Sequence, residues 1–261
     1  MSDLLAEKNG HVAILRLNRP DRMNAISAEM LTELGRRLVE YDHDADVRAV
    51  ILTGEGRGFC AGLDLKDTAA GRGIGGSLGG ASHISTLEIP TVTLHRIDTP
   101  VICAINGPAA GYGFDLALGC DIRLMSDRAK LAPAFAKRGI VPESGGTWYL
   151  PRLVGWAKAC EIGFIADDIT PERAAEMGLI NKVVAHDDLM AESMRWAEKI
   201  AANAPLGVKA IKRLFRHGLS EDFESHTHHV LMQLLVLFRS NDFQEGLRSF
   251  LEKRPPNFQG K

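Results

Sequence analysis

The feature that most constrains the fold of this chain is an apolar strand that runs through a glycine turn directly into a helix. Val101 to Ile105 is continuously apolar, Gly111-Tyr112-Gly113 follows, and an apolar helical segment opens after it. Glycines let the backbone approach a ligand, because no Cβ stands in the way. The first N–H groups of a helix lack partners and carry partial positive charge. The turn therefore predicts a site for an oxygen that becomes negative, with Asp115 as an acid beside it.

Strands and helices alternate through the first two thirds of the chain. Further strands are predicted at His11 to Leu17, Val47 to Leu52 and Asp121 to Met125. Ser27 is a suitable N-cap for a helix between the first two of these strands. A strand–helix–strand order indicates crossover units and a mostly parallel sheet. The sequence therefore predicts an α/β fold.

The last part of the chain has a different pattern, in which amphipathic helices follow one another without strands. The composition shifts near Ala201, so we expect a core over residues 1–200 and a helical region over residues 201–261. The helices of this part are predicted at Leu189 to Ala202, Pro205 to His217, Glu221 to Phe238 and Asp242 to Lys253.

Composition and charge narrow the class of protein. A net charge of −2 over 261 residues favours neither nucleic acid nor an anionic membrane as partner, although a local basic patch leaves RNA binding open. The four cysteines form no CxxC pair and are predicted to be reduced thiols. The sequence predicts no signal peptide and no membrane span, so we expect a cytoplasmic protein. The possible basic patch comprises Lys209, Lys212, Arg213 and Arg216.

Two motifs lack the context that their usual chemistry requires. Gly71 to Gly76 matches G-x-G-x-x-G, but no strand precedes it and no apolar helix follows, so a dinucleotide site is not expected. The histidines between His226 and His229 lack the i, i+4 spacing of a zinc pair. Lys66 to Ser82, rich in glycine, is predicted to be a mobile loop.

A second glycine turn, Ala61-Gly62-Leu63-Asp64, also follows a strand. One N–H from each turn would bind a single carbonyl oxygen, which suits a thioester that is converted to an enolate. In these turns the sequence resembles the crotonase family, the enoyl-CoA hydratases and isomerases. The resemblance covers essentially the whole chain and includes Asn18-Arg19-Pro20, Asn24-Ala25, Gly58 to Leu65, Cys120 to Arg123, Phe135 to Thr147, Ala174 to Val184 and Phe250 to Arg254.

The resemblance implies a spiral of ββα units with a C-terminal helical region used for trimerisation, and a homotrimer or a hexamer built from two trimers. It implies a coenzyme A thioester as ligand, with no metal and no redox cofactor. It places the oxyanion-hole donors on the backbone N–H groups of Leu63 and Tyr112. The predicted contacts with coenzyme A are Arg22, Asn24, Ala25, Ala61, Gly62, Leu63, Asp64, Leu65, Tyr112 and Lys253.

The resemblance also identifies two carboxylates. Asp115 occupies the position of the first catalytic acid, but the second glutamate of the hydratases is replaced by Phe135. Glu143 stands where several isomerases of the family keep their proton-transferring acid. The pair Asp115 and Glu143 favours double-bond isomerisation over hydration, and partial burial is expected to raise the pKa of both.

Simpler interpretations stay open for single residues. Asp115 alone would suit the first turn of a helix, and Glu143 alone would suit a solvated turn. Asp64 is interpreted as a residue that steadies its own turn. For the protein as a whole, hydration of 2-enoyl-CoA and a non-catalytic role in binding acyl-CoA are the alternatives to isomerisation.

Overall fold

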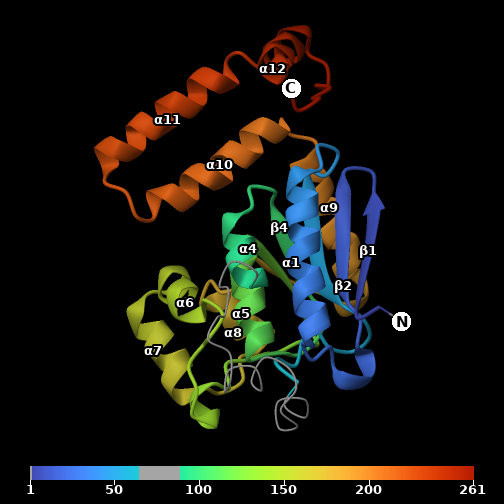
Figure 1. Ribbon diagram of the computed structural model, residues 1–261, viewed down its shortest axis with the longest axis vertical. Helices are drawn as coiled ribbons and strands as arrows, with labels where there is room; N and C mark the ends of the chain where they lie inside the picture. The colour runs from blue at the N-terminus through green and yellow to red at the C-terminus, as the bar shows by residue number, and fades with distance from the viewer. Residues whose placement is uncertain (1, 65–88) are drawn as a thin grey trace.

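The computed structural model describes residues 2–64 and 89–261 and is built around a six-stranded sheet with the order β1-β2-β3-β4-β6-β8 (Figure 1). β1 and β2 are antiparallel, and every later pair of neighbours is parallel. The predicted α/β class is therefore confirmed. The strands are β1 (Leu4–Asn9), β2 (Val12–Leu17), β3 (Ala49–Gly54), β4 (Val101–Ile105), β6 (Ile122–Ser126) and β8 (Lys182–Val184), and β5 (Ala109–Ala110) pairs with β7 (Leu131–Ala132) in a small second sheet.

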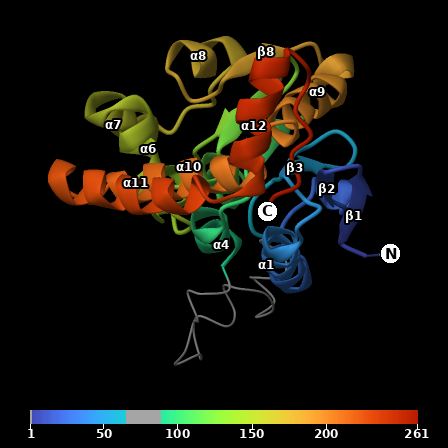
Figure 2. The ribbon, with the colours of Figure 1, turned by 90° about the horizontal axis from the view of Figure 1, so that it is seen from above.

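Both faces of the sheet are covered, because alternate residues of each strand point to opposite sides. In β2, Leu15 and Leu17 pack in the larger core under α1 (Ala28–His43), whereas Ile14 packs in a second core under α9 (Leu189–Ala201). Figure 2 shows the sheet between α1 and α4 (Pro90–Arg96) on one side and α9 on the other. This double cover explains why the central strands are almost purely apolar.

Helix α1 follows from the sequence pattern directly. Its N-cap Ser27 accepts a hydrogen bond from the Met30 N–H at 3.1 Å. Met30, Leu34 and Leu38 recur every four residues and are fully buried, which places one apolar stripe against the sheet. The remaining helices are α5 (Tyr112–Gly119), α6 (Gly146–Val154), α7 (Trp156–Ile165), α8 (Pro171–Glu176), α10 (Pro205–Gly218), α11 (Phe223–Leu237) and α12 (Asn241–Glu252).

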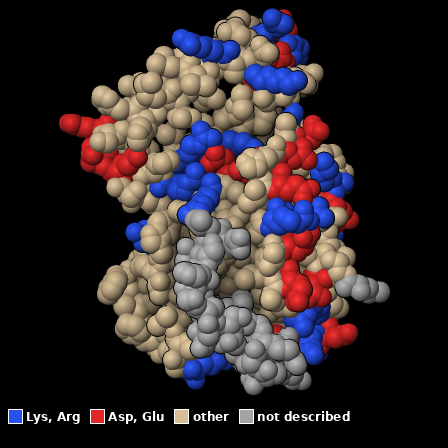
Figure 3. All heavy atoms as spheres, viewed as in Figure 1, with Lys and Arg blue, Asp and Glu red and all other residues tan. Residues whose placement is uncertain are grey.

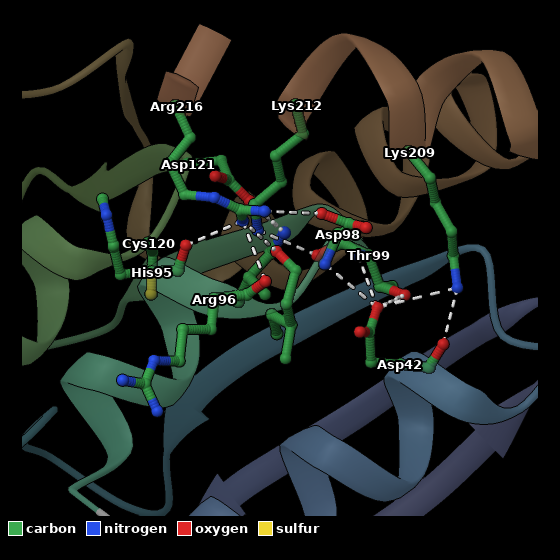
Figure 4. Close-up of polar contacts among 12 residues, drawn as sticks. Asp42, His95, Arg96, Asp98, Thr99, Cys120, Asp121, Lys209, Lys212 and Arg216 are labelled. Atoms are coloured by element: carbon green, nitrogen blue, oxygen red, sulfur yellow. Dashed lines mark hydrogen bonds and ion pairs between the residues drawn. The ribbon is translucent and has the colours of Figure 1, made fainter. Parts of the chain in front are cut away.

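Basic residues of α10 attach the C-terminal helices to the rest of the chain (Figure 4). Arg213 and Arg216 both pair with Asp98, at 2.5 and 2.9 Å. Lys212 pairs with Asp121 at 2.7 Å, and Lys209 donates to the backbone of α1. The four cations that the sequence left open as an RNA-binding patch thus have acidic partners in the core.

The apolar residues of helix α11 are not buried by the rest of this chain. None of its residues is buried, and Met232 and Val236 are 61% and 67% exposed. Figure 3 shows acidic side chains at the left end of α11 and a surface almost free of charge along the rest of the helix. Among the described residues, no helix is long and apolar enough to cross a membrane.

Several elements were not predicted. β1 has only one buried residue, so it lacks the alternation that marks a half-buried strand. β8 has three residues, and helices α7 and α8 have few buried positions. The sequence does predict a helix from Ile84 to Ile97, and within the described part of that stretch helix α4 spans Pro90–Arg96. The predicted loop from Lys66 to Ser82 lies outside the described residues.

Candidate active site

Backbone hydrogen bonds bring together the two glycine turns at the carboxyl ends of the parallel strands. The Ala110 N–H donates to the Cys60 carbonyl at 2.9 Å, and the Ile26 N–H donates to the Gly62 carbonyl at 2.8 Å. Parallel bridges connect Cys60 with Ala109 and Ile26 with Leu63. The turn that carries Leu63 is therefore held directly beside the turn that opens α5.

Gly62 shows how tightly the two turns approach each other. Its φ is +95°, and a Cβ there would lie 2.8 Å from the Ala110 oxygen and 3.5 Å from the Tyr112 nitrogen. A Cβ on Gly113 would lie 2.3 Å from the Cys60 oxygen. Both glycines are required for this contact because any side chain would separate the turns. The backbone of Gly62 thus lies against the Tyr112 N–H.

Asp115 lies in the first turn of α5 and is fully buried. Its Oδ2 accepts a hydrogen bond from the Ser144 N–H at 3.0 Å. A Cβ on Gly146 would lie 2.1 Å from Oδ1, so this glycine leaves the space that the carboxyl group fills. Burial raises the pKa of Asp115 to about 7, and the nearby Glu143 charge adds to this effect. The carboxyl group can therefore gain or lose a proton near neutral pH.

Glu143 lies in the turn before α6, where its side chain remains accessible to solvent. Desolvation by its surroundings raises the pKa of this carboxyl group. It lines a largely apolar cavity of about 300 Å³, together with its neighbour Ser144. Asp115 does not line this cavity, but its hydrogen bond to the Ser144 N–H ties it to the same turn. The other residues of the cavity wall are Ile89, Thr91, Val92, His95, Gly145, Trp148 and Tyr149.

Aromatic rings form one wall of the cavity. Trp148 makes edge-to-face contacts with His95 and Tyr149, with ring centroids 5.0 Å apart in both pairs. Burial lowers the pKa of His95, which favours its neutral form. The sequence predicted Trp148 as an apolar neighbour of the two acids but did not identify His95 or Tyr149, because no motif links α4 and α6. Such a wall suits an apolar group of a ligand.

The predicted coenzyme A contacts near the chain start have structural partners. Asp64 is 6% exposed and forms ion pairs of 3.1 Å with Arg19 and Arg22. Asn24 is buried at φ 55°, and its amide donates to the carbonyls of Glu55 and Gly58. The Asn24 side chain thus joins its own turn to the loop that follows β3. Asn24 and Asp64 are buried, whereas Arg22 is exposed and accessible to a ligand.

The remaining predicted contacts are not all at this site. Lys253 is the C-cap of α12, which Figure 1 shows at the opposite end of the molecule from the carboxyl end of β2. Within one chain it does not meet Leu63 or Tyr112. Leu65 lies outside the described residues. Among the described residues, no group of three or more His, Cys, Asp or Glu is arranged to hold a metal ion.

Comparisons with known proteins give one consistent result. Residues 7–261 match the family model for enoyl-CoA hydratase/isomerase. The chain is 36% identical to a 1,2-epoxyphenylacetyl-CoA isomerase of Escherichia coli K12, with both proteins covered completely. It is 35% identical to a short-chain-enoyl-CoA hydratase of Clostridium acetobutylicum over 97% of this chain and 96% of the relative. A crystal structure of an enoyl-CoA hydratase from Bacillus anthracis matches with a TM-score of 0.92 and 34% identity, covering 99% of this chain and all of the other.

Proposed function

Because the chain belongs to the enoyl-CoA hydratase/isomerase family, we propose that it moves the double bond of an enoyl-CoA thioester through an enolate intermediate. The observation that carries this proposal is that one turn brings two acids together: Glu143, in the turn before α6, lines the cavity, and Asp115, in α5, is tied to the neighbouring Ser144 N–H. The place of the second hydratase acid is taken by Phe135, which is 4% exposed. This arrangement supports isomerisation over hydration.

The thioester oxygen would lie between the backbone N–H groups of Leu63 and Tyr112. Support comes from the contact of Gly62 with the Tyr112 nitrogen, which places the two turns side by side. Among the described residues, neither N–H donates to another backbone carbonyl. Two fixed donors aimed at a developing oxyanion contribute roughly 3 to 4 kcal/mol each to the stability of the transition state.

Proton transfer is assigned to the two carboxyl groups. Glu143 faces the cavity and removes a proton from the acyl chain, because a carboxylate with a raised pKa is a stronger base than an ordinary one. Asp115, with its pKa of about 7, assists at the second carbon. Hydration remains the second candidate, since two neighbouring acids are also able to hold a water, and one relative is named a short-chain-enoyl-CoA hydratase.

The direct test is incubation of the purified protein with 2-enoyl-CoA and with 3-enoyl-CoA. Migration of the double bond is expected, and fast addition of water without migration would contradict the isomerase assignment. Binding of both thioesters without turnover would identify a non-catalytic acyl-CoA binder.

Glu143→Gln tests the role assigned to the cavity acid. This substitution is expected to reduce kcat by about 100-fold or more and to leave the affinity for acyl-CoA nearly unchanged. Glu176→Gln is the matched control, because Glu176 is an exposed residue of α8 whose surface ion pair with Arg173 contributes little. A full rate in Glu143→Gln would exclude Glu143 from the mechanism.

We further propose that the chain assembles as a homotrimer or as a hexamer of two trimers. The support is the exposed apolar surface of the C-terminal helices, where Phe215, Phe223 and Phe250 are 74%, 84% and 79% exposed. Assembly would also allow Lys253 of one copy to approach the ligand of another. Light scattering coupled to gel filtration measures the mass, and a stable monomer would contradict the proposal.

A further inference from the structure

Arg123 is a buried arginine in β6 whose guanidinium group lies at the C-terminal end of α5. Its Nη1 donates to the Cys120 carbonyl oxygen at 2.5 Å and to the carbonyl oxygens of Ala117 and Leu118 at 3.4 Å. Its Nε donates to the Leu179 carbonyl oxygen at 2.7 Å. In the described part of the chain no acid forms an ion pair with this cation, and its guanidinium donates to backbone carbonyl groups instead.

The end of α5 needs these donors because it is buried. The last carbonyl groups of a helix have no N–H partner within the helix and carry partial negative charge. Water or a left-handed glycine satisfies them in many helices. Here the C-cap Cys120 is 4% exposed and extended, at φ −75° and ψ 158°. A guanidinium group offers several donors in a fixed fork and a charge that suits this end of the helix. Arg123 therefore fixes where α5 ends.

The segment before β8 holds Arg123 in turn. The Arg123 N–H donates to Asn181 Oδ1 at 2.9 Å, and the Asn181 N–H donates to the Arg123 carbonyl oxygen at 2.8 Å. Cys120 to Arg123 and Ala174 to Val184 are two of the stretches in which the sequence resembles its family. These contacts join the two stretches, which the proposed mechanism leaves without a role, and they fix the end of α5 to both.

We infer that Arg123 is a positioning residue for the oxyanion hole, which acts through α5 and not by contact with the ligand. Tyr112 is the first residue of this helix, and Asp115 lies in its first turn. The helix has 8 residues, so its two ends are only about 12 Å apart and move together. The role of Arg123 in the oxyanion hole rests on the proposed function, because the Tyr112 N–H is the donor that it would orient.

A tilt of α5 is the expected result when its C-terminal end is released. All residues of the helix are buried, and Gly113 packs against the Cys60 backbone, so the helix has little freedom to unfold. The N–H groups of the first turn point along the helix axis, and a tilt of that axis redirects the Tyr112 N–H. A displacement of about 1 Å in a group that positions a reaction reduces the rate by roughly 100-fold.

Infrared spectroscopy of a saturated acyl-CoA with a ¹³C-labelled thioester carbonyl tests this role without turnover. In the native protein, hydrogen bonds from the oxyanion hole are expected to lower the carbonyl stretching frequency on binding. Arg123→Met keeps a long side chain without donors or charge, and is expected to reduce this shift to about half or less. With the enoyl-CoA substrate, kcat should fall by about 10- to 100-fold while KM changes by less than about threefold.

Arg48→Met is the matched control for a loss of stability alone. Arg48 is a half-buried arginine that also donates to the last residue of a helix, because its Nη1 lies 3.1 Å from the Ala201 carbonyl oxygen at the end of α9. Helix α9 covers the opposite face of the sheet from α1 and α4 (Figure 2). Urea unfolding shows how much stability each variant loses, and Arg48→Met is expected to keep the native carbonyl shift and kcat.

Arg123→Lys serves as the second variant, and it decides the question if Arg123→Met does not fold. An ammonium group keeps the charge but lacks the fork, so the carbonyl shift is expected to be smaller than in the native protein and larger than in a folded Arg123→Met. A native carbonyl shift and a native kcat in a folded Arg123 variant, or the same losses in Arg48→Met, would overturn the assignment. The proposed oxyanion hole would fail separately, through the absence of any carbonyl shift in the native protein, and the role of Arg123 would fail with it.

Discussion

The carboxyl ends of the strands and the C-terminal helices differ in how closely they pack within the chain. At the strand ends, backbone segments around Gly62 and Gly113 pack so closely that no side chain fits between them. In α11, by contrast, none of the residues is buried, and apolar side chains face outward. The first region is completed by contacts within the chain, whereas the second leaves its largest apolar surface unpartnered. The proposed active site and the proposed assembly surface thus lie at separate ends of the molecule (Figure 1).

The largest effect is expected from Gly62→Ala, which tests how tightly the strand ends must pack. The new Cβ would meet the Ala110 oxygen at 2.8 Å, and the backbone at φ +95° would be strained. Because the two turns would separate, kcat/KM is expected to fall by about 100- to 1,000-fold in a steady-state assay. Gly155→Ala is the matched control: its φ is +77°, but nothing lies within 4 Å of the new Cβ. Equal losses in both variants would show that strain alone is responsible.

A pH-dependent effect on stability is expected from the buried acid. The pKa of Asp115 rises from 3.8 to about 7 on folding, so the folded protein holds this proton more tightly than the unfolded chain. Stability is therefore lost as the pH rises from about 4 to about 7, by roughly 1.4 kcal/mol per pH unit at most. Asp115→Asn removes this dependence and is expected to be the more stable protein above neutral pH.

Urea unfolding of both proteins across this window measures the difference. Asp187→Asn is the control, because Asp187 is 81% exposed and its ion pair with Arg128 lies at the surface. Parallel stability curves for the native protein and Asp115→Asn would contradict the assignment of a raised pKa to Asp115.

A smaller effect, on the free energy of unfolding, is expected where α10 contacts the core. Asp98 accepts ion pairs from both Arg213 and Arg216, so Asp98→Ala leaves two partly buried cations without their shared partner. The free energy of unfolding is expected to fall by about 1 to 3 kcal/mol. Hydrogen exchange should increase mainly in α10 and α11, while acyl-CoA binding per intact site is retained. Faster exchange at the strand ends instead would show that the two regions are not independent.

The two regions also differ in how far the sequence predicts them. Helices α9 to α12 were predicted within two residues at each end, because their amphipathic periodicity is a local property. The contacts of α10 were not predicted, since Lys209 and Asp42 are 167 positions apart. A run of cations looks the same in a sequence whether it faces solvent or an acidic partner.

The candidate site also has a part that the sequence predicts and a part that it does not. The turns at Gly62 and Gly111 were predicted, because glycine is required wherever the backbone makes such an approach. Trp148 was predicted as an apolar neighbour of the acids, but its contacts with His95 and Tyr149 were not, since they depend on how α4 packs beside α5 and α6.

The smallest effect on folding, and a selective effect on assembly, is expected from Met232→Lys. Met232 is 61% exposed in α11, so its replacement removes few contacts within the chain and should change the free energy of unfolding by less than about 0.5 kcal/mol. In an apolar contact between copies, however, a buried lysine charge is strongly unfavourable, and the assembly should dissociate. Val39→Lys is the control, because Val39 is 42% exposed on α1, in the core region. A loss of mass in Met232→Lys alone assigns assembly to the C-terminal helices, whereas the same loss in Val39→Lys would extend the contact to the core and weaken the division between the two regions.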